Sequence, residues 1–173
     1  IGLDMGANAE TTAVHLAQFG IMGSLYSHYI MDIENPRVAL MSIGVEMSKG
    51  NHLIKDAGAK LSALHEQGII RFIGHVEGND LFSGEADVIV FPGFTGNVVL
   101  KVAESVLPTL NEALKQKLKK SSFVRKVFAL FAKITLSPTI ASLKRDFDYQ
   151  KYGGAPLLGV KGIIIKAHGR STP

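Results

Sequence analysis

The chain has 173 residues, a net charge of +4 and 46% apolar residues, which suits one globular domain or part of one and excludes a disordered chain. It contains no cysteine, which excludes disulfides, a cysteine nucleophile and thiolate metal sites and fits a reducing cytosol. It contains no run of about 18 apolar residues, so no segment is expected to span a bilayer.

Hydrophobic periodicity and turn residues predict alternating strands and helices. Strands are predicted at residues 1–4, 37–43, 69–76, 87–91 and 162–166. Helices are predicted at 12–31 and 52–67, and from 97 to 148 with a break at Pro138. Gly20 and Gly23 weaken the first helix, and Gly68 is expected to end the second. Because Ile1 stands within an apolar run, we expect the first strand to begin upstream and residues 1–173 to be a single-domain part of a larger protein.

The predicted strands are apolar throughout, which is typical of a parallel sheet covered on both faces. Their alternation with helices predicts an α/β fold with a three-layer α/β/α sandwich and a mostly parallel sheet. In such a sheet the loops that follow the strands meet at one edge, where ligands bind. Four polar, glycine-containing loops are expected there, at residues 4–8, 44–51, 74–80 and 92–97.

These four loops predict a site for phosphate or another oxyanion. Glycine lets backbone amides approach a ligand, and the N-terminus of the helix expected from Asn97 offers free amides and partial positive charge. Lys49 and Lys101 add charge. One loop of this kind is more often only a turn, but four at one edge favour a site.

Other kinds of site have less support. The segment at 93–97 (GFTGN) lacks the full glycine spacing of a dinucleotide or phosphate-binding fingerprint, so a nicotinamide cofactor is weakly supported. The histidines lack metal-ligand spacing: His15 and His65 lie in helical patterns, whereas His52 and His75 lie by the candidate site. No serine has the context of a nucleophile elbow. We therefore expect no metal and no cofactor.

Six segments in order together resemble one family. They are LDMGAN, QFGIMGS, ENPRVALMSIGVEMSKGN, GHVEGNDLFSGEADVIV, GFTGNVVLK and YGGAPLLGVKGIIIKAHG, and they extend from residue 1 to about residue 169. This combination is similar to the bacterial phosphate acyltransferase family of phospholipid synthesis (PlsX).

The resemblance implies transfer of a fatty acyl group from acyl carrier protein to inorganic phosphate, which forms acyl phosphate without a cofactor. It implies a fold like that of the isocitrate and isopropylmalate dehydrogenases, and a homodimer. It also implies a cytoplasmic enzyme that associates peripherally with the inner face of the bacterial membrane. The chain would then be the C-terminal half of that enzyme.

With this resemblance, the strand-end residues can be given roles. Those expected to act in catalysis, by holding phosphate and thioester or by orienting lysines and moving protons, are Asn8, Glu46, Lys49, Asn51, Glu77 and Asn97. Those expected to bind phosphate or substrate are Gly6, Gly50, Gly93, Gly96 and Lys101, with the backbone amides of 93–96. For the acids, an ordinary loop salt bridge is an equally good interpretation.

Two positions depart from the family's pattern. The family usually has aspartate directly before the glycine of its GF-x-GN loop, where this chain has Pro92. Met47 stands where a second acid is common. An acid at a strand end could orient a ligand or a lysine. The presence of Pro92 in place of aspartate therefore bears on catalysis and on the geometry of this loop.

The charge is unevenly distributed. Nine basic residues and no acidic ones lie between Ala113 and Arg145, which gives this segment a charge of +9 and the remainder −5. Its apolar and cationic residues fall on opposite helical faces, which suits the membrane interface. The residues expected to associate with a membrane are Phe123, Lys126, Val127, Phe128, Phe131, Lys133 and Ile134.

The basic segment leaves alternatives open. Residues 108–148 could also form a protruding helical arm that dimerises, or a docking surface for the acidic acyl carrier protein. Nucleic-acid binding is least supported, because no aromatic and basic interleaving accompanies the charge. A non-catalytic module that binds membrane or carrier protein is the alternative to the acyltransferase, and a nicotinamide-dependent dehydrogenase-like protein is a weaker one.

Overall fold

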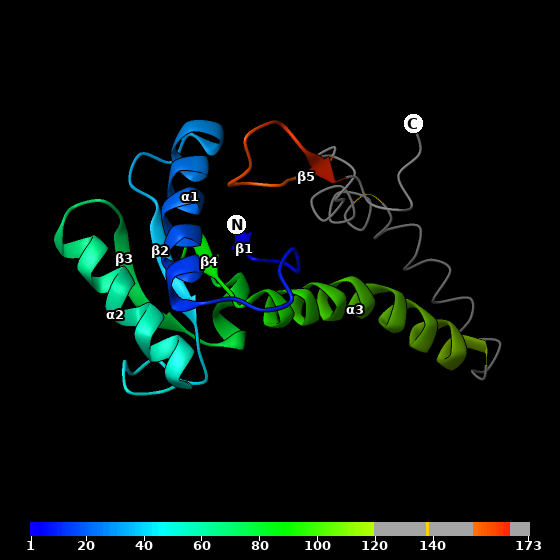
Figure 1. Cartoon of the computed structure of the whole chain (residues 1–173). Helices are drawn as coiled ribbons and strands as arrows, with labels where there is room; N and C mark the ends of the chain where they lie inside the picture. Colours follow the sequence, from blue (N-terminus) through cyan, green and yellow to red (C-terminus); the bar gives the residue numbers. More distant parts are fainter. Residues whose placement is uncertain (120–137, 139–153, 167–173) are drawn as a thin grey trace. The chain divides into compact units, whose positions relative to one another are not determined.

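The computed structural model describes residues 1–119, 138 and 154–166 (Figure 1). Contacts between Cα atoms divide the chain into two units, Ile1–Val102 and Ala103–Pro173. The strand-end loops that the sequence singles out all belong to the first unit.

The first unit is built on a sheet of four parallel strands. They are β1 (Gly2–Leu3), β2 (Arg37–Met41), β3 (Arg71–Val76) and β4 (Val88–Val90), and their order across the sheet is β1-β4-β2-β3. Leu3 and Leu40 both lie beside Val90 in the register, so the strands end at a common level. This confirms the predicted α/β class with a mostly parallel sheet.

Two long helices, α1 (Ala13–Met31) and α2 (His52–Glu66), lie side by side on one face of the sheet (Figure 1). Each begins where a side chain caps it: Thr12 Oγ1 accepts from the amide of His15 at 3.3 Å, and Asn51 Oδ1 accepts from that of Ile54 at 3.0 Å. The core of this face is formed by Leu16, Val38, Leu40, Ile54, Ala57, Leu61, Ile70, Phe72, Val88 and Val90.

Gly20 and Gly23 do not interrupt α1, although each was expected to weaken it. A Cβ on Gly20 would lie 2.6 Å from Leu61 Cδ2, and one on Gly23 would lie 2.5 Å from Val88 Cγ1. The glycines therefore let α1 approach α2 and β4 closely. The packing gained there outweighs a loss of helix propensity of about 1 kcal/mol per glycine.

The opposite face of the sheet carries a second apolar cluster, formed by Ala39, Met41, Val76, Ile89 and Phe91. Leu81 of the 3₁₀ helix η1 (Gly78–Phe82) and Val99 of helix α3 (Gly93–Lys119) pack against it. Both faces of the strands are thus covered within the first unit, as their apolar composition predicts.

The start of α3 corrects one prediction. The sequence suggested a loop through residue 96 and a helix from Asn97, but α3 begins at Gly93. The carbonyl of Pro92 accepts from the amide of Gly96 at 2.9 Å, which closes the first helical turn. Two glycines in that turn have poor helix propensity, and the sequence pattern alone gives no sign of the tertiary contact that places them there.

In the second unit the structure describes the remainder of α3, which contains Pro108, and two short antiparallel strands, β5 (Ala155–Pro156) and β6 (Ile165–Lys166). The predicted arm at 108–148 lies largely outside the described residues. So do all the residues expected to associate with a membrane: Phe123, Lys126, Val127, Phe128, Phe131, Lys133 and Ile134. Within the described ranges, no helix is both long and apolar enough to cross a membrane.

An ion pair joins two strand starts at the edge away from the candidate site. The guanidinium of Arg37 binds the Asp87 carboxylate through Nε at 2.9 Å and Nη2 at 3.0 Å, and the Arg37 amide donates to it at 2.8 Å. The side-chain hydrogen bond from Arg37 is the main cause that holds the pKa of Asp87 below its ordinary value of 3.8.

We expect Asp87→Asn to lower the free energy of unfolding at pH 7 by about 1 kcal/mol, because the guanidinium is partly exposed. The pKa of Asp87 is lower in the folded than in the unfolded state. The difference between wild type and variant is therefore complete above about pH 4 and disappears as the pH falls through the folded-state pKa. Urea unfolding at several pH values across this range measures the difference in free energy of unfolding. The control is Asp56→Asn, which changes an exposed aspartate of α2. A difference that does not change with pH would contradict the assignment.

Candidate functional site at the carboxyl ends of the strands

The four parallel strands bring their following loops to one edge of the sheet. In strand order, this edge carries the loop of Asp4–Asn8 after β1, the start of α3 after β4, the loop at 44–51 after β2 and η1 after β3. The predicted strand-end residues therefore share one edge. Within the described part of the chain, their contacts form two groups.

The first group centres on the carboxylate of Asp4, a residue that is only 7% exposed. Asp4 Oδ1 accepts from the amides of Gly6 at 2.8 Å and Ala7 at 2.7 Å. Asp4 Oδ2 accepts from the amide of Asn8 at 2.8 Å and from its Nδ2 at 2.7 Å. One buried carboxylate thus fixes the whole loop.

The ionised form of Asp4 is the stable one in this setting. Burial by itself raises the pKa of Asp4, but the hydrogen bonds from Ala7, Asn8 and Gly6 together outweigh it and hold the pKa below its ordinary value. A carboxylate that accepts several amide hydrogen bonds is stabilised in this way. Asp4 is therefore a fixed negative charge at the strand-end edge.

The glycines at the start of α3 lie against the backbone of this loop. A Cβ on Gly93 would collide with the carbonyl oxygen of Asn8 and lie 2.8 Å from Asp4 Oδ2, and one on Gly96 would collide with the carbonyl oxygen of Asp4. A Cβ on Gly6 would lie 2.9 Å from the Cβ of Asn97. The structure thus brings five predicted site residues together: Gly6, Asn8, Gly93, Gly96 and Asn97.

This packing changes the roles expected of two glycines. The amide of Gly96 already donates to Pro92, so it is not available to a phosphate as the sequence suggested. At Gly93, the Asp4 carboxylate lies beside the first turn of α3, where a negative charge is favoured by the helix dipole. Hence the carboxylate of Asp4 supplies an acid in this strand-end region, beside the helix start that follows Pro92.

The second group is the loop after β2. The amide of Lys49 donates to the carbonyl of Glu46 at 2.9 Å, and the Nδ1 of His75 lies 3.2 Å from the same oxygen. Gly50 has φ of +92°, which favours glycine, and leads to the cap of α2. The Asn51 Oδ1 caps that helix, so this atom has a structural task besides any contact with a ligand. Lys49 and Glu46 are both exposed.

The other two predicted site residues lie on neighbouring elements. Glu77 follows β3 directly, and its amide donates to Asp80 Oδ2 at 2.8 Å. Lys101 lies on α3, one turn after Asn97, and is exposed. Among the described residues, no group of three side chains is arranged to hold a metal ion.

Two residues of the site, Asp4 and His75, have no role predicted from the sequence. Asp4 carries a signal, because aspartate followed by small residues is typical of a side chain that binds nearby amides. His75 is predicted only to lie near the site. Its position depends on the register of the sheet, which the spacing of apolar residues does not reveal.

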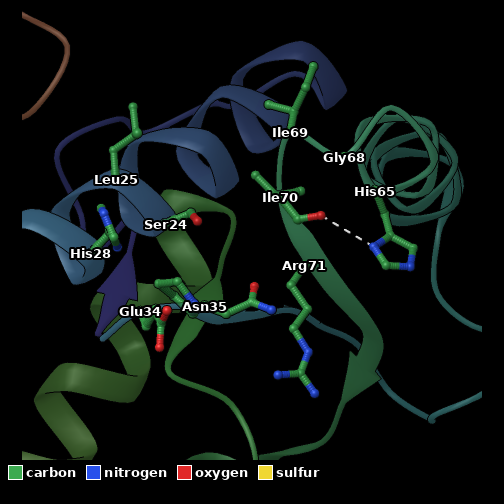
Figure 2. Close-up of a pocket in the computed structure, with 11 residues that line it drawn as sticks. Ser24, Leu25, His28, Glu34, Asn35, His65, Gly68, Ile69, Ile70 and Arg71 are labelled. Atoms are coloured by element: carbon green, nitrogen blue, oxygen red, sulfur yellow. Dashed lines mark hydrogen bonds between the residues drawn. The ribbon is translucent and has the colours of Figure 1, made fainter. Parts of the chain in front are cut away.

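A cavity lies away from these loops. This cavity has a volume of about 530 Å³ and lies where α1 and α2 end and β2 and β3 begin. Figure 2 shows residues that line it, among them Ser24, His28, Asn35, His65 and Arg71. His65 Nδ1 lies 3.2 Å from the carbonyl oxygen of Ile70. The cavity contains none of the predicted site residues, and ligands of parallel sheets bind at the other edge.

Nearly the whole chain is similar to proteins named phosphate acyltransferase. The phosphate acyltransferase of Desulforudis audaxviator is 47% identical over 170 residues, which is 98% of this chain and 48% of that protein. Those of a Nitratiruptor species and of Myxococcus xanthus are 46% and 47% identical over 99% of this chain. The chain thus spans about half the length of the curated relatives it matches. A family model described as "Fatty acid synthesis protein" matches residues 1–173. The chain therefore belongs to the fatty acid synthesis protein family.

Proposed function

We propose that this protein takes part in the transfer of a fatty acyl group from acyl carrier protein to inorganic phosphate, which yields acyl phosphate for phospholipid synthesis. The observation that carries this proposal is the similarity of nearly the whole chain to proteins named phosphate acyltransferase. These relatives favour an acyltransferase over a non-catalytic binding module or a dehydrogenase-like protein. Assay of acyl phosphate from acyl carrier protein thioester and phosphate, with the full-length protein, tests the proposal.

The proposed reaction needs alignment more than covalent catalysis. A phosphate oxygen attacks the thioester carbonyl carbon, the carbon–sulfur bond breaks, and the carrier thiol leaves with a proton. Bringing phosphate and thioester into contact out of water lowers the barrier, and donors aimed at the carbonyl oxygen stabilise the tetrahedral oxyanion. No acyl-enzyme is required, so the absence of cysteine is no obstacle.

The strand-end residues divide into three proposed roles. Lys49, Lys101 and the amides of α3 before Gly96 would attract phosphate. Asn97 and the second Nδ2 hydrogen of Asn8, whose first is donated to Asp4, would donate to phosphate or to the thioester carbonyl. Glu46 and Glu77 would orient lysines or receive a proton. The glycines have a different task in this scheme, because Gly6, Gly93 and Gly96 let the Asp4 loop and α3 approach each other.

We expect Lys49→Ala to reduce acyl-phosphate formation at least tenfold, because a cation that attracts phosphate is lost. Lys55→Ala serves as the matched control, because Lys55 is an exposed lysine of α2 outside the loop, and this variant should keep wild-type turnover. The measurement is acyl-phosphate formation at saturating acyl carrier protein over a range of phosphate concentrations. Unchanged turnover of Lys49→Ala at every phosphate concentration would remove it from the site.

The proposal extends to partners and location. The segment of charge +9 between Ala113 and Arg145 suits both an acidic carrier protein and anionic lipid. We place the enzyme in the cytoplasm, as a homodimer with a three-layer fold like that of the isocitrate and isopropylmalate dehydrogenases. The arm at 108–148 would meet the partner copy or the inner membrane surface. Co-sedimentation with vesicles that contain or lack anionic lipid tests the membrane part, and loss of binding without anionic lipid is expected.

A further inference from the structure

His75, at the carboxyl end of β3, owes the direction of its side chain to an irregularity of the sheet. Relative to β2, strand β3 contains one extra residue, Ile73, followed by Gly74 with φ of +103°. An extra residue reverses the face to which the following side chains point. His75 therefore lies beside Leu40, on the face covered by α2.

The imidazole of His75 is buried beneath α2. The residue is only 5% exposed, and within the described part of the chain its Nε2 has no hydrogen-bond partner. Gly58 of α2 leaves space for the ring, since a Cβ there would lie 3.0 Å from Nε2. Burial lowers the pKa of His75 more than its bond to Glu46 raises it, so the ring is neutral at neutral pH.

The other ring nitrogen of His75 reaches the loop of the second site group. Nδ1 lies 3.2 Å from the carbonyl oxygen of Glu46, and because a carbonyl only accepts, we assign the ring proton to Nδ1. The amide of Lys49 donates to the same oxygen at 2.9 Å. One carbonyl thus connects a buried histidine to the backbone of an exposed lysine.

We propose that His75 is a positioning residue for Lys49, on which it acts through the carbonyl of Glu46. The inference rests on the proposed function, in which Lys49 attracts phosphate. For packing alone, an apolar side chain would avoid the cost of a buried nitrogen without a partner. The contribution of the ring is therefore the hydrogen bond that it donates to the loop.

Two substitutions separate positioning from packing. His75→Leu removes the donor and also the unpartnered Nε2, whereas His75→Asn keeps a nitrogen donor attached to Cγ, where Nδ1 stands. In the full-length enzyme, His75→Leu is expected to raise the KM for phosphate about tenfold and to speed hydrogen exchange at the Lys49 amide about tenfold, with the KM for acyl carrier protein unchanged. His75→Asn should restore both quantities to within about twofold of wild type.

His65→Leu is the matched control. His65 Nδ1 also lies 3.2 Å from a backbone carbonyl oxygen, that of Ile70, but at the opposite edge of the sheet. This variant should change neither the KM for phosphate nor exchange at Lys49. The proposal fails if His75→Leu leaves both quantities at wild-type values, or if His75→Asn is as impaired as His75→Leu. Absence of acyl phosphate from the wild type would overturn the proposed function instead, and the exchange measurement would still test the link to Lys49.

Discussion

Asp4→Asn is expected to reduce the free energy of unfolding by about 2–4 kcal/mol and acyl-phosphate formation by about 100-fold. The carboxylate of Asp4 accepts four hydrogen bonds from Gly6, Ala7 and Asn8. An asparagine offers one oxygen and turns an NH₂ group toward the remaining donors, so at least one buried donor loses its partner. The Asp4 loop would then lose its position against α3. A displacement of reacting groups by about 1 Å is enough to reduce the rate about 100-fold.

The control for this variant is Asp80→Asn. Asp80 Oδ2 accepts one backbone hydrogen bond, from Glu77, in another loop of the same edge. Its replacement is expected to cost about 1 kcal/mol or less and to leave turnover within about threefold of wild type. Thermal unfolding and the acyl-phosphate assay measure both variants. If Asp4→Asn behaved like Asp80→Asn, the carboxylate of Asp4 would not be the group that holds the site loop.

Gly96→Ala is expected to destabilise the protein by about 3 kcal/mol and to remove most of the proposed acyltransferase activity. Alanine in a helix is intrinsically better than glycine by about 1 kcal/mol, which acts in the opposite direction. Here the added Cβ would collide with the carbonyl oxygen of Asp4. Since the obstacle is backbone, no rotamer change relieves the collision, and the steric cost exceeds the gain in propensity.

Gly78→Ala is the companion measurement for the glycine contact. Gly78 begins η1 at the same edge of the sheet, and a Cβ there would have no atom within 4 Å. The free energy of unfolding of Gly78→Ala should differ from that of wild type by no more than about 0.5 kcal/mol. Chemical denaturation of both variants compares them directly. A Gly96→Ala protein as stable and active as Gly78→Ala would show that the contact between α3 and the Asp4 loop is dispensable.

The parts of the fold that local pattern determines were predictable from sequence. The helices predicted at 12–31 and 52–67 differ from α1 and α2 by at most one residue at either end, because apolar spacing and, for the second helix, Gly68 mark them. The apolar strands likewise predicted a parallel sheet, and hence one edge for the loops. At this level, residue type and short-range spacing carry the information.

The features that fix the site depend on contacts between distant segments. The start of α3 at Gly93 follows from the fit of its glycines against Asp4 and Asn8, about 90 residues earlier in the sequence. The orientation of His75 follows from one extra residue in β3, which becomes visible only when β3 is aligned with β2. Propensity and periodicity describe neighbours in sequence, so they miss both features.

The strand order has a consequence for assembly during synthesis. In the described sheet, β1 pairs only with β4, which also pairs with β2, so the strand made last of the four lies between the two made first. A nascent chain that ends before Val88 can pair β2 with β3 but leaves β1 without its neighbour. The Asp4 loop therefore meets its partners only after α3 has begun to emerge, and long-range pairing of this kind slows folding. Such an unfinished chain contains the Asp4 loop but lacks the start of α3, against which this loop packs.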